Sequence, residues 1–355
     1  MSSNKKTKRG DDFNSGNESM TLGSLYKREY ERKFQKFEKI LSMPIVDIQE
    51  LKEISWHGIP RKFRPRAYRL FLDYEPINHE QAKNSLEHKR NDYLDCLNRV
   101  FDSKQKLFWT NGQKRILHQI QIDLPRTNYK LLHDDKVQEI FQHVLFIWAI
   151  RHPASSYVQG MNDILIPFFI LFLSQYFEET ELEDILKMEN INELDDKCLK
   201  EIEADCFWCF STMLDGIQDT FTKGQPGIFR MINQLQSIIK VVEPKLNDWI
   251  EKENINYMTF MFKWINCMFV REFSIQQLFR IWDIMINRYA KITLSQVYIS
   301  AAMITTLSPL LINLPASEFI IKIQEISPEF WDEKRTNEII AQSFVYEKLF
   351  PQLTC

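Results

Sequence analysis

The feature that most constrains this chain is an apolar repeat with helical spacing between Lys136 and Ile150. Its apolar residues recur at intervals of three and four, the spacing that places side chains on one face of an α-helix. Three further apolar residues widen that face, so we expect a helix that is buried nearly all round. We expect it to end before Pro153, because the residue that precedes a proline disfavours helical geometry. The repeat consists of Val137, Ile140, Phe141, Val144, Leu145, Trp148 and Ala149, widened by Phe146, Ile147 and Ile150.

Three other apolar segments also favour helices. The segment "FMFKWINCMFVREFSIQQLFRIWDIMI" predicts two helices that separate at "REFS", with Ser274 as the N-cap and Gln277 completing a capping box. The segment "LSQVYISAAMITTLSPLLI" predicts a helix closed by Pro309. The run "ILIPFFILFL" has ten residues, whereas a membrane span needs about 20, so it predicts a buried helix and any membrane contact would be peripheral.

These segments predict an all-α protein with one large helical body. No segment alternates apolar and polar residues over more than a few positions, and nine glycines in 355 residues are few for a protein rich in turns. Residues 1–24 are polar and predict a disordered tail, residues 25–49 predict an N-terminal helix and linker, and residues 50–355 form the apolar body. That body of roughly 300 residues is large enough for two lobes.

The composition and the absence of several motifs exclude many functions. The net charge of −3 and the pI of about 6.2 do not indicate a nucleic-acid partner. The chain lacks the phosphate-binding loop, dinucleotide-binding, zinc-protease and hydrolase motifs, so we expect no cofactor or nucleotide site of its own. The six cysteines are scattered and favour reduced thiols. Cys206 and Cys209 in "DCFWCF" favour core packing over a metal site, and we expect no metal.

Two loops carry polar residues of interest. In "IQIDLPRT", Pro125 predicts an extended or turn conformation, in which Asp123 would hold the guanidinium of Arg126 outward. The alternative is a structural salt bridge at the start of a helix. In "PASSYVQGMND", either serine would cap the next helix and Gly160 would allow close approach to Gln159. The alternative is that Gln159 is an ordinary polar residue of a first helical turn. For each loop alone, the structural alternative is favoured.

Taken together, the two loops indicate half of an active site. Hydrolysis of GTP requires positive charge on the β- and γ-phosphate oxygens and a polar group that orients the attacking water. An arginine supplied in trans increases the rate by about 10³ to 10⁵. A chain that offers Arg126 and Gln159 but has no recognisable nucleotide site fits the half that acts on a partner GTPase.

The same residues resemble motifs of the TBC-domain Rab GTPase-activating proteins. The opening stretch "SWHGIPRKFRPRAYRL" is similar to the first family motif, and "FKWINCMFVREFSIQQLFRIWD" is similar to the late one. The four motifs occur in the family order between about residue 50 and the C-terminus. The stretch "LFIWAIRHPASSYVQGMNDILIPFF" resembles the Golgi-associated branch shared by fungi and animals. The two central motifs are I-x-x-D-x-x-R at Ile120, Asp123 and Arg126, and Y-x-Q-G at Tyr157, Gln159 and Gly160.

The resemblance implies a two-lobed helical fold and a mechanism with two catalytic side chains. Arg126 would neutralise charge on the transferred phosphoryl group, and Gln159 would orient water. Asp123 would position Arg126, Arg64 would brace the groove, and Asp163 would support the Gln159 loop. The supporting residues of the site are therefore Asp123, Arg64, Tyr157, Gly160 and Asp163.

The resemblance also implies the partner and the setting. The partner would be a GTP-bound Rab that carries its own Mg²⁺ and GTP, and an adaptor would be compatible with recruitment to membranes. The chain would be cytoplasmic or peripheral on Golgi or other endomembranes, and would regulate vesicle traffic. The alternatives are a non-catalytic Rab-binding adaptor with the same fold and a structural scaffold. The scaffold predicts that Arg126 and Gln159 are buried, paired and far apart.

Three residues depart from the family pattern. Tyr68 stands where tryptophan is usual, Ser156 replaces a glycine before Tyr157, and Tyr129 stands where a proline often follows the arginine and threonine. We expect the first to change packing, the second to stiffen the Gln159 loop, and the third to change how the Arg126 loop is held.

Overall fold

Helices and their connections make up the described chain, as the apolar spacing predicts. A computed structural model describes residues 22–127 and 129–354, and within these ranges no strand forms beyond an isolated bridge between Ile45 and Asn78. The first ten α-helices are α1 (Leu22–Leu41), α2 (Ile48–Ser55), α3 (Arg64–Phe71), α4 (His79–Phe101), α5 (Ser103–Lys106), α6 (Asn111–Asp123), α7 (Asp135–Arg151), α8 (Met161–Leu173), α9 (Leu182–Lys187) and α10 (Asp196–Asp215). The remaining seven are α11 (Pro226–Val242), α12 (Pro244–Lys252), α13 (Met258–Asn266), α14 (Ile275–Asn287), α15 (Ile292–Leu311), α16 (Ala316–Gln324) and α17 (Glu333–Leu349).

Short 3₁₀ helices connect several of these elements. They are η1 (Arg61–Phe63), η2 (Leu124–Arg126), η3 (Lys130–His133), η4 (Gln218–Thr220), η5 (Tyr289–Lys291), η6 (Pro328–Phe330) and η7 (Pro351–Thr354). Most of the predicted tail, residues 1–21, lies outside the described residues. The helix α1 falls where an N-terminal helix is predicted, but it begins at Leu22, within the predicted tail, and it ends ahead of Pro44.

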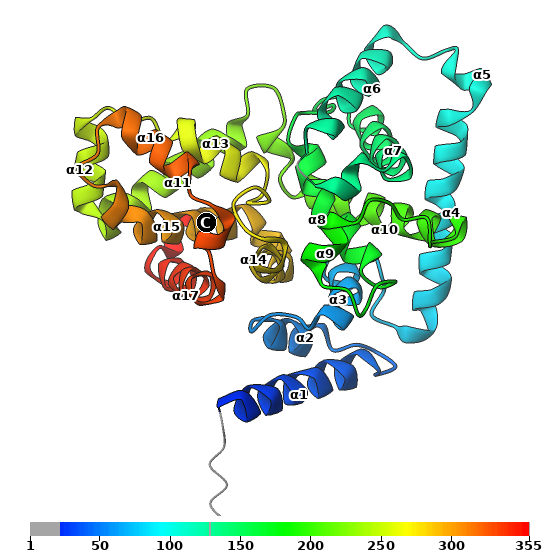
Figure 1. The fold of residues 1–355 in the computed structure, drawn as a ribbon, viewed down its shortest axis with the longest axis horizontal. Helices are drawn as coiled ribbons and strands as arrows, with labels where there is room; N and C mark the ends of the chain where they lie inside the picture. Colours follow the sequence, from blue (N-terminus) through cyan, green and yellow to red (C-terminus); the bar gives the residue numbers. More distant parts are fainter. Residues whose placement is uncertain (1–21, 128, 355) are drawn as a thin grey trace, which may run out of the picture.

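The helices form two lobes (Figure 1). One lobe contains α3 to α10 and the other contains α11 to α17, while α1 and α2 lie along one end of the molecule. The predicted helix at 136–150 is α7, which ends before Pro153 as expected. The run "ILIPFFILFL" is part of α8, whose thirteen residues are all buried. Cys206 and Cys209 are buried in α10, so their predicted role in core packing is confirmed.

The helix α15 departs from the prediction at its C-terminal end. It continues through Pro309 to Leu311, so the expectation that Pro309 closes it was wrong. A proline removes one backbone hydrogen bond, and here the burial of the helix outweighs that loss. Among the described residues, the stretch Tyr289–Leu311 is the one helical segment long and apolar enough to cross a membrane, but 72% of its most apolar window is buried inside the fold. It is therefore better described as a core helix.

Asp283 of α14 ties the lobes together. Its carboxylate accepts hydrogen bonds from Arg64 Nε at 2.9 Å, from the Ile59 backbone N at 2.7 Å and from the Tyr68 hydroxyl at 2.9 Å. Trp282 beside it packs against Phe168 of α8 with ring centroids 5.3 Å apart. The Tyr68 hydroxyl, which a tryptophan would lack, joins this cluster, so the departure from the family pattern at this position is accommodated in the core.

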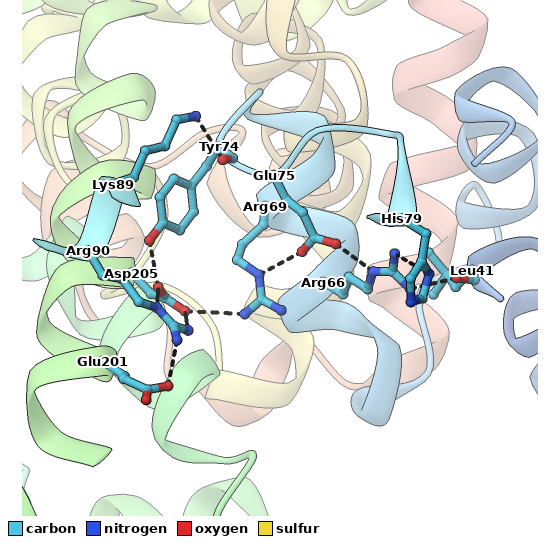
Figure 2. A network of polar contacts seen from close by, with 10 residues as sticks. All are labelled: Leu41, Arg66, Arg69, Tyr74, Glu75, His79, Lys89, Arg90, Glu201 and Asp205. Carbon is cyan, nitrogen blue, oxygen red and sulfur yellow. Dashed lines mark hydrogen bonds and ion pairs between the residues drawn. The ribbon is translucent and has the colours of Figure 1, made fainter. Parts of the chain in front are cut away.

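A second buried polar cluster joins α3, α4 and α10 (Figure 2). Asp205, 1% exposed, accepts hydrogen bonds from Arg90 Nε at 2.8 Å, from Arg69 Nη1 at 3.2 Å and from the Tyr74 hydroxyl at 2.7 Å. Burial alone would lower the pKa of Arg69, but the nearby carboxylates raise it and keep the group charged. The cluster holds α3, α4 and α10 together, and these helices pack against α7 and α8.

Candidate functional site

Arg126 projects from the end of a helix rather than from an extended loop. The helix α6 runs to Asp123 and tightens directly into the 3₁₀ turn η2, in which Leu124 is helical with φ −58° and ψ −47°. Of the two predicted conformations, extended or turn, the turn forms, but the expectation that Pro125 biases Leu124 away from helical geometry was wrong. Pro125 lies in the first turn of η2, where the fixed φ of proline is compatible with helical geometry.

A buried carboxylate holds Arg126. Asp123 is 2% exposed, and its Oδ1 lies 3.2 Å from Arg126 Nη1, whereas the Arg126 side chain is 61% exposed. The other contacts of Asp123 come from Gln119 Nε2 at 3.1 Å and from the Tyr157 hydroxyl at 3.1 Å. Burial and the charge of Asp123 raise the pKa of Tyr157, so this hydroxyl remains protonated and can donate. The predicted positioning of Arg126 by Asp123 agrees with this geometry.

Gln159 lies in the loop between α7 and α8. The loop is longer than predicted, because α8 begins at Met161 and Gly160 occupies its N-cap without a side-chain cap. The expectation that Ser155 or Ser156 caps this helix was therefore wrong. Instead, Asn162 Oδ1 accepts a hydrogen bond from the Gly160 backbone N at 3.2 Å. The Gln159 side chain is exposed.

The opposite lobe fixes the backbone of Gln159. Asn266, at the end of α13, donates from Nδ2 to the carbonyl oxygen of Gln159 at 2.8 Å. Gly160 has a φ of +106°, and a Cβ atom at this position would lie 2.2 Å from the same Asn266 nitrogen. Close approach to the Gln159 loop thus requires glycine, as predicted. Sequence reasoning missed Asn266, although a polar residue within the apolar segment "KWINCMF" needs a buried partner and could have indicated it.

We expect the substitution Gly160→Ala to destabilise the fold by about 1 to 3 kcal/mol, because alanine is strained at this φ and its Cβ displaces Asn266. Urea unfolding of both proteins measures this difference in free energy. The matched control is Gly224→Ala, where φ is +84° but a Cβ would meet no atom within 4 Å. Equal losses at the two positions would contradict a specific role for the Asn266 contact.

Ser156 also adopts a backbone conformation that favours glycine. Its φ is +56°, in the left-handed region, at the position where the family pattern has glycine. We expect Ser156→Gly to raise the free energy of unfolding by up to about 1 kcal/mol, because relief of strain exceeds the added entropy of the unfolded chain. Urea unfolding tests this as well. A lower stability for the glycine variant would show that the serine is not strained here.

Asp163 and Arg271 form the third part of the site. Arg271 Nη2 lies 2.7 Å from Asp163 Oδ2, and the Cys267 thiol donates to the same oxygen at 3.5 Å. Burial alone would lower the pKa of Arg271, but Asp163 raises it, so the group stays charged. Asp163, predicted to support the Gln159 loop, thus joins α8 to the segment before α14. Sequence reasoning assigned no role to Arg271, although it lies within the late motif "REF".

These groups meet in one groove between the lobes. The groove has a volume of about 470 Å³. Arg126, Gln159 and Arg271 line it, and their side chains are exposed or half-exposed. Arg126 and Gln159 therefore share an exposed site, which disagrees with the purely structural alternative. The buried carboxylates of Asp123 and Asp163 hold Arg126 and Arg271 and leave these two side chains accessible to solvent. The groove is lined by Asp123, Arg126, Thr127, Tyr129, Gln159, Asn162, Asp163 and Ile166 from one lobe and by Arg271 and Pro328 from the other.

The remaining predicted residues fall at the groove or behind it. Tyr129 lines the groove, and burial raises the pKa of its hydroxyl. Tyr157 lies beneath it as a donor to Asp123. Arg64 is not among the groove residues, because its guanidinium is turned into the lobe junction at Asp283. This contact joins the two lobes. Within the described ranges, no group of three or more His, Cys, Asp or Glu residues is arranged to hold a metal ion.

Comparisons with known proteins identify relatives of the same architecture. The family model described as the Rab-GTPase-TBC domain matches residues 61–312. TBC1 domain family member 22B of Homo sapiens is 34% identical over 321 residues, covering 90% of this chain and 62% of the human protein. The GTPase-activating protein GYP1 of Saccharomyces cerevisiae is 36% identical over 255 residues, covering 71% of this chain and 39% of the yeast protein. The crystal structure of the Ypt/Rab-GAP domain of Gyp1p superposes with a TM-score of 0.84 at 32% identity, covering 90% of this chain and 99% of that one.

Proposed function

Because the chain belongs to the Rab-GTPase-TBC domain family, we propose that it stimulates GTP hydrolysis by Rab-family small GTPases. The observation that carries this proposal is the groove, in which Arg126 and Gln159 are both exposed and are held from opposite sides. The chain spans 62% of the length of the first human relative, so activity and partner are proposed for this domain rather than taken from that protein.

In the proposed reaction, Arg126 enters the active site of the partner. Its guanidinium stabilises the negative charge that develops on the transferred phosphoryl group and the β–γ bridging oxygen. Asp123 contacts Nη1, and the side chain remains 61% exposed, so the guanidinium is oriented without being enclosed. Because Asp123 is itself buried and hydrogen-bonded, Arg126 loses less conformational freedom when a partner binds.

Gln159 acts on the attacking water in this proposal. A carboxamide offers both a donor and an acceptor, so it can align a water molecule with the γ-phosphate. The contact from Asn266 fixes the backbone and leaves the side chain exposed. We propose that Mg²⁺ and GTP come with the partner, and that Golgi or other endomembranes are where the reaction takes place.

The experiment that tests this function is single-turnover GTP hydrolysis by a panel of purified Rab proteins. We expect this chain to accelerate one or a few of them strongly, and the Arg126→Ala and Gln159→Ala variants to lose most of that acceleration. If the wild-type chain binds GTP-loaded Rab proteins but accelerates none, then it is a Rab-binding adaptor and the catalytic proposal is wrong.

For Gln159→Ala we expect the stimulated rate to fall by about 10² to 10³, the usual effect of removing one preorganised polar group from a transition state. Binding to the GTP-loaded partner should change little. The control is Gln121→Ala, an exposed glutamine of α6 that is not among the groove residues and contacts Gln142. A Gln159→Ala rate equal to that of the control would remove Gln159 from the mechanism.

A further inference from the structure

The connection between α4 and α6 presents two adjacent apolar side chains to solvent. Leu107 is 78% exposed and Phe108 is 79% exposed, more than any other large apolar residue among those described. They directly follow the short helix α5, at the outer end of the lobe that contains α3 to α10 (Figure 1). Two neighbouring large apolar residues with this much exposed surface are unusual where a protein surface contacts only water.

The next residue anchors this turn to the fold. The Trp109 ring packs against Phe101 with centroids 5.5 Å apart and against Phe146 of α7 with centroids 4.7 Å apart. Its indole Nε1 donates to the Val100 carbonyl oxygen at 3.3 Å. Because Trp109 fixes the base of the turn, Leu107 and Phe108 are held outward in the absence of a partner.

Positive charge surrounds the two apolar residues. Residues 99–115 contain five basic residues and one acidic residue, a net charge of +4 in a chain whose total is −3. The acidic residue, Asp102, uses its Oδ1 to cap α5 by accepting from the Lys104 and Gln105 backbone N atoms. The basic residues are Arg99, Lys104, Lys106, Lys114 and Arg115, and all five are exposed.

We propose that this tip inserts into the surface of an anionic phospholipid bilayer. Leu107 and Phe108 would enter the boundary between headgroups and acyl chains, while the surrounding lysine and arginine side chains would contact lipid phosphates. Charge complementarity favours a bilayer over an uncharged protein groove, and the high exposure of both apolar residues suits contact with a flat surface.

This placement leaves the groove free. The tip precedes the N-terminus of α6, and Arg126 follows its C-terminus. The thirteen residues of α6 span about 20 Å. A single helix therefore connects the proposed membrane contact to the groove.

Sedimentation of the full chain with vesicles tests the proposal. The vesicles contain phosphatidylcholine with or without phosphatidylserine. We expect binding only when phosphatidylserine is present, and we expect Leu107→Ser combined with Phe108→Ser to weaken it about tenfold or more. Lys104→Glu combined with Lys106→Glu should also weaken it, and added salt should weaken the wild-type chain.

The matched control is Phe229→Ser combined with Val241→Ser, two exposed apolar residues of α11 in the other lobe. This pair should bind vesicles like the wild-type chain, and thermal unfolding should show that all variants are folded. The basic residues near the N-terminus also attract anionic lipid, but their contribution is the same in every variant. If the wild-type chain does not bind, or if the tip variant binds as well as the control, then the bilayer proposal is wrong. The assay does not depend on GTP hydrolysis, so it fails or succeeds independently of the catalytic proposal.

Discussion

Replacing Arg126 with alanine should reduce the stimulated rate of GTP hydrolysis by about 10³ to 10⁵, the contribution of an arginine supplied in trans. The side chain is 61% exposed, but its partner Asp123 is buried, so its removal should also lower the stability of the free protein, while Gln119 and Tyr157 still donate to that carboxylate. Single-turnover hydrolysis at saturating concentrations of the activator separates the loss of rate from any loss of affinity.

Two further variants serve as comparisons in this experiment. Arg126→Lys keeps the charge but lacks the planar group that contacts two oxygens at once, so we expect it to recover little of the rate. Arg115→Ala removes an exposed arginine from α6, the helix that precedes η2, without touching the groove, and should behave like the wild-type chain in solution. If Arg126→Ala retained near-normal stimulation, Arg126 would be a structural ion pair after all.

Asp123 allows the positioning of Arg126 to be tested separately from the charge of Arg126. Its carboxylate contacts Arg126, Gln119 and Tyr157, and although it lines the groove, its 2% exposure leaves almost no surface for a partner. Its effect on the rate should therefore pass through Arg126. In the Arg126→Ala variant, a further substitution of Asp123 should lower the stimulated rate of GTP hydrolysis hardly any more, because the two residues act as one unit.

The sequence predicted the helices well where local spacing decides the structure. The helix α7 and the buried helix α8 follow from apolar spacing, and Ser274 caps α14 as predicted by accepting from the Gln277 backbone N. The predictions that were wrong concern prolines and a loop, whose conformations depend on more than their immediate neighbours in the sequence. Pro309 lies inside a buried helix and Pro125 lies in the first turn of a 3₁₀ helix, two settings in which proline does not end helical structure.

The groove could be predicted only in part. The short motifs identified Asp123, Arg126, Gln159 and Gly160, which lie close together in the chain. Asn266 and Arg271 come from more than a hundred residues away, and one sequence does not identify the partner of a contact at such a separation. The same reason explains Arg64, whose partner Asp283 lies 219 residues away in the chain, so a bracing role in the groove was expected where the structure shows a contact between the lobes.

The largest effect on stability is expected from Asp205→Ala. The change would remove four hydrogen-bond contacts and leave Arg69 and Arg90 beside an uncharged cavity, with side chains only 11% and 22% exposed (Figure 2). Breaking a buried ion pair by removing one partner costs about 3 to 5 kcal/mol, since the remaining charge has lost its water and its partner. We expect a loss of this size in the free energy of urea unfolding.

Glu201 provides the matched control, because it pairs with the same Arg90 at 2.5 Å but its side chain is 31% exposed. Solvent can replace a partly exposed partner, so Glu201→Ala should cost at most about 1 kcal/mol. Asp205→Asn keeps the shape and one acceptor oxygen but loses the charge, and should fall between the two. If Asp205→Ala cost no more than Glu201→Ala, then Glu75, which remains bonded to Arg69 at 3.0 Å, would be sufficient to stabilise the cluster and Asp205 would not be its centre.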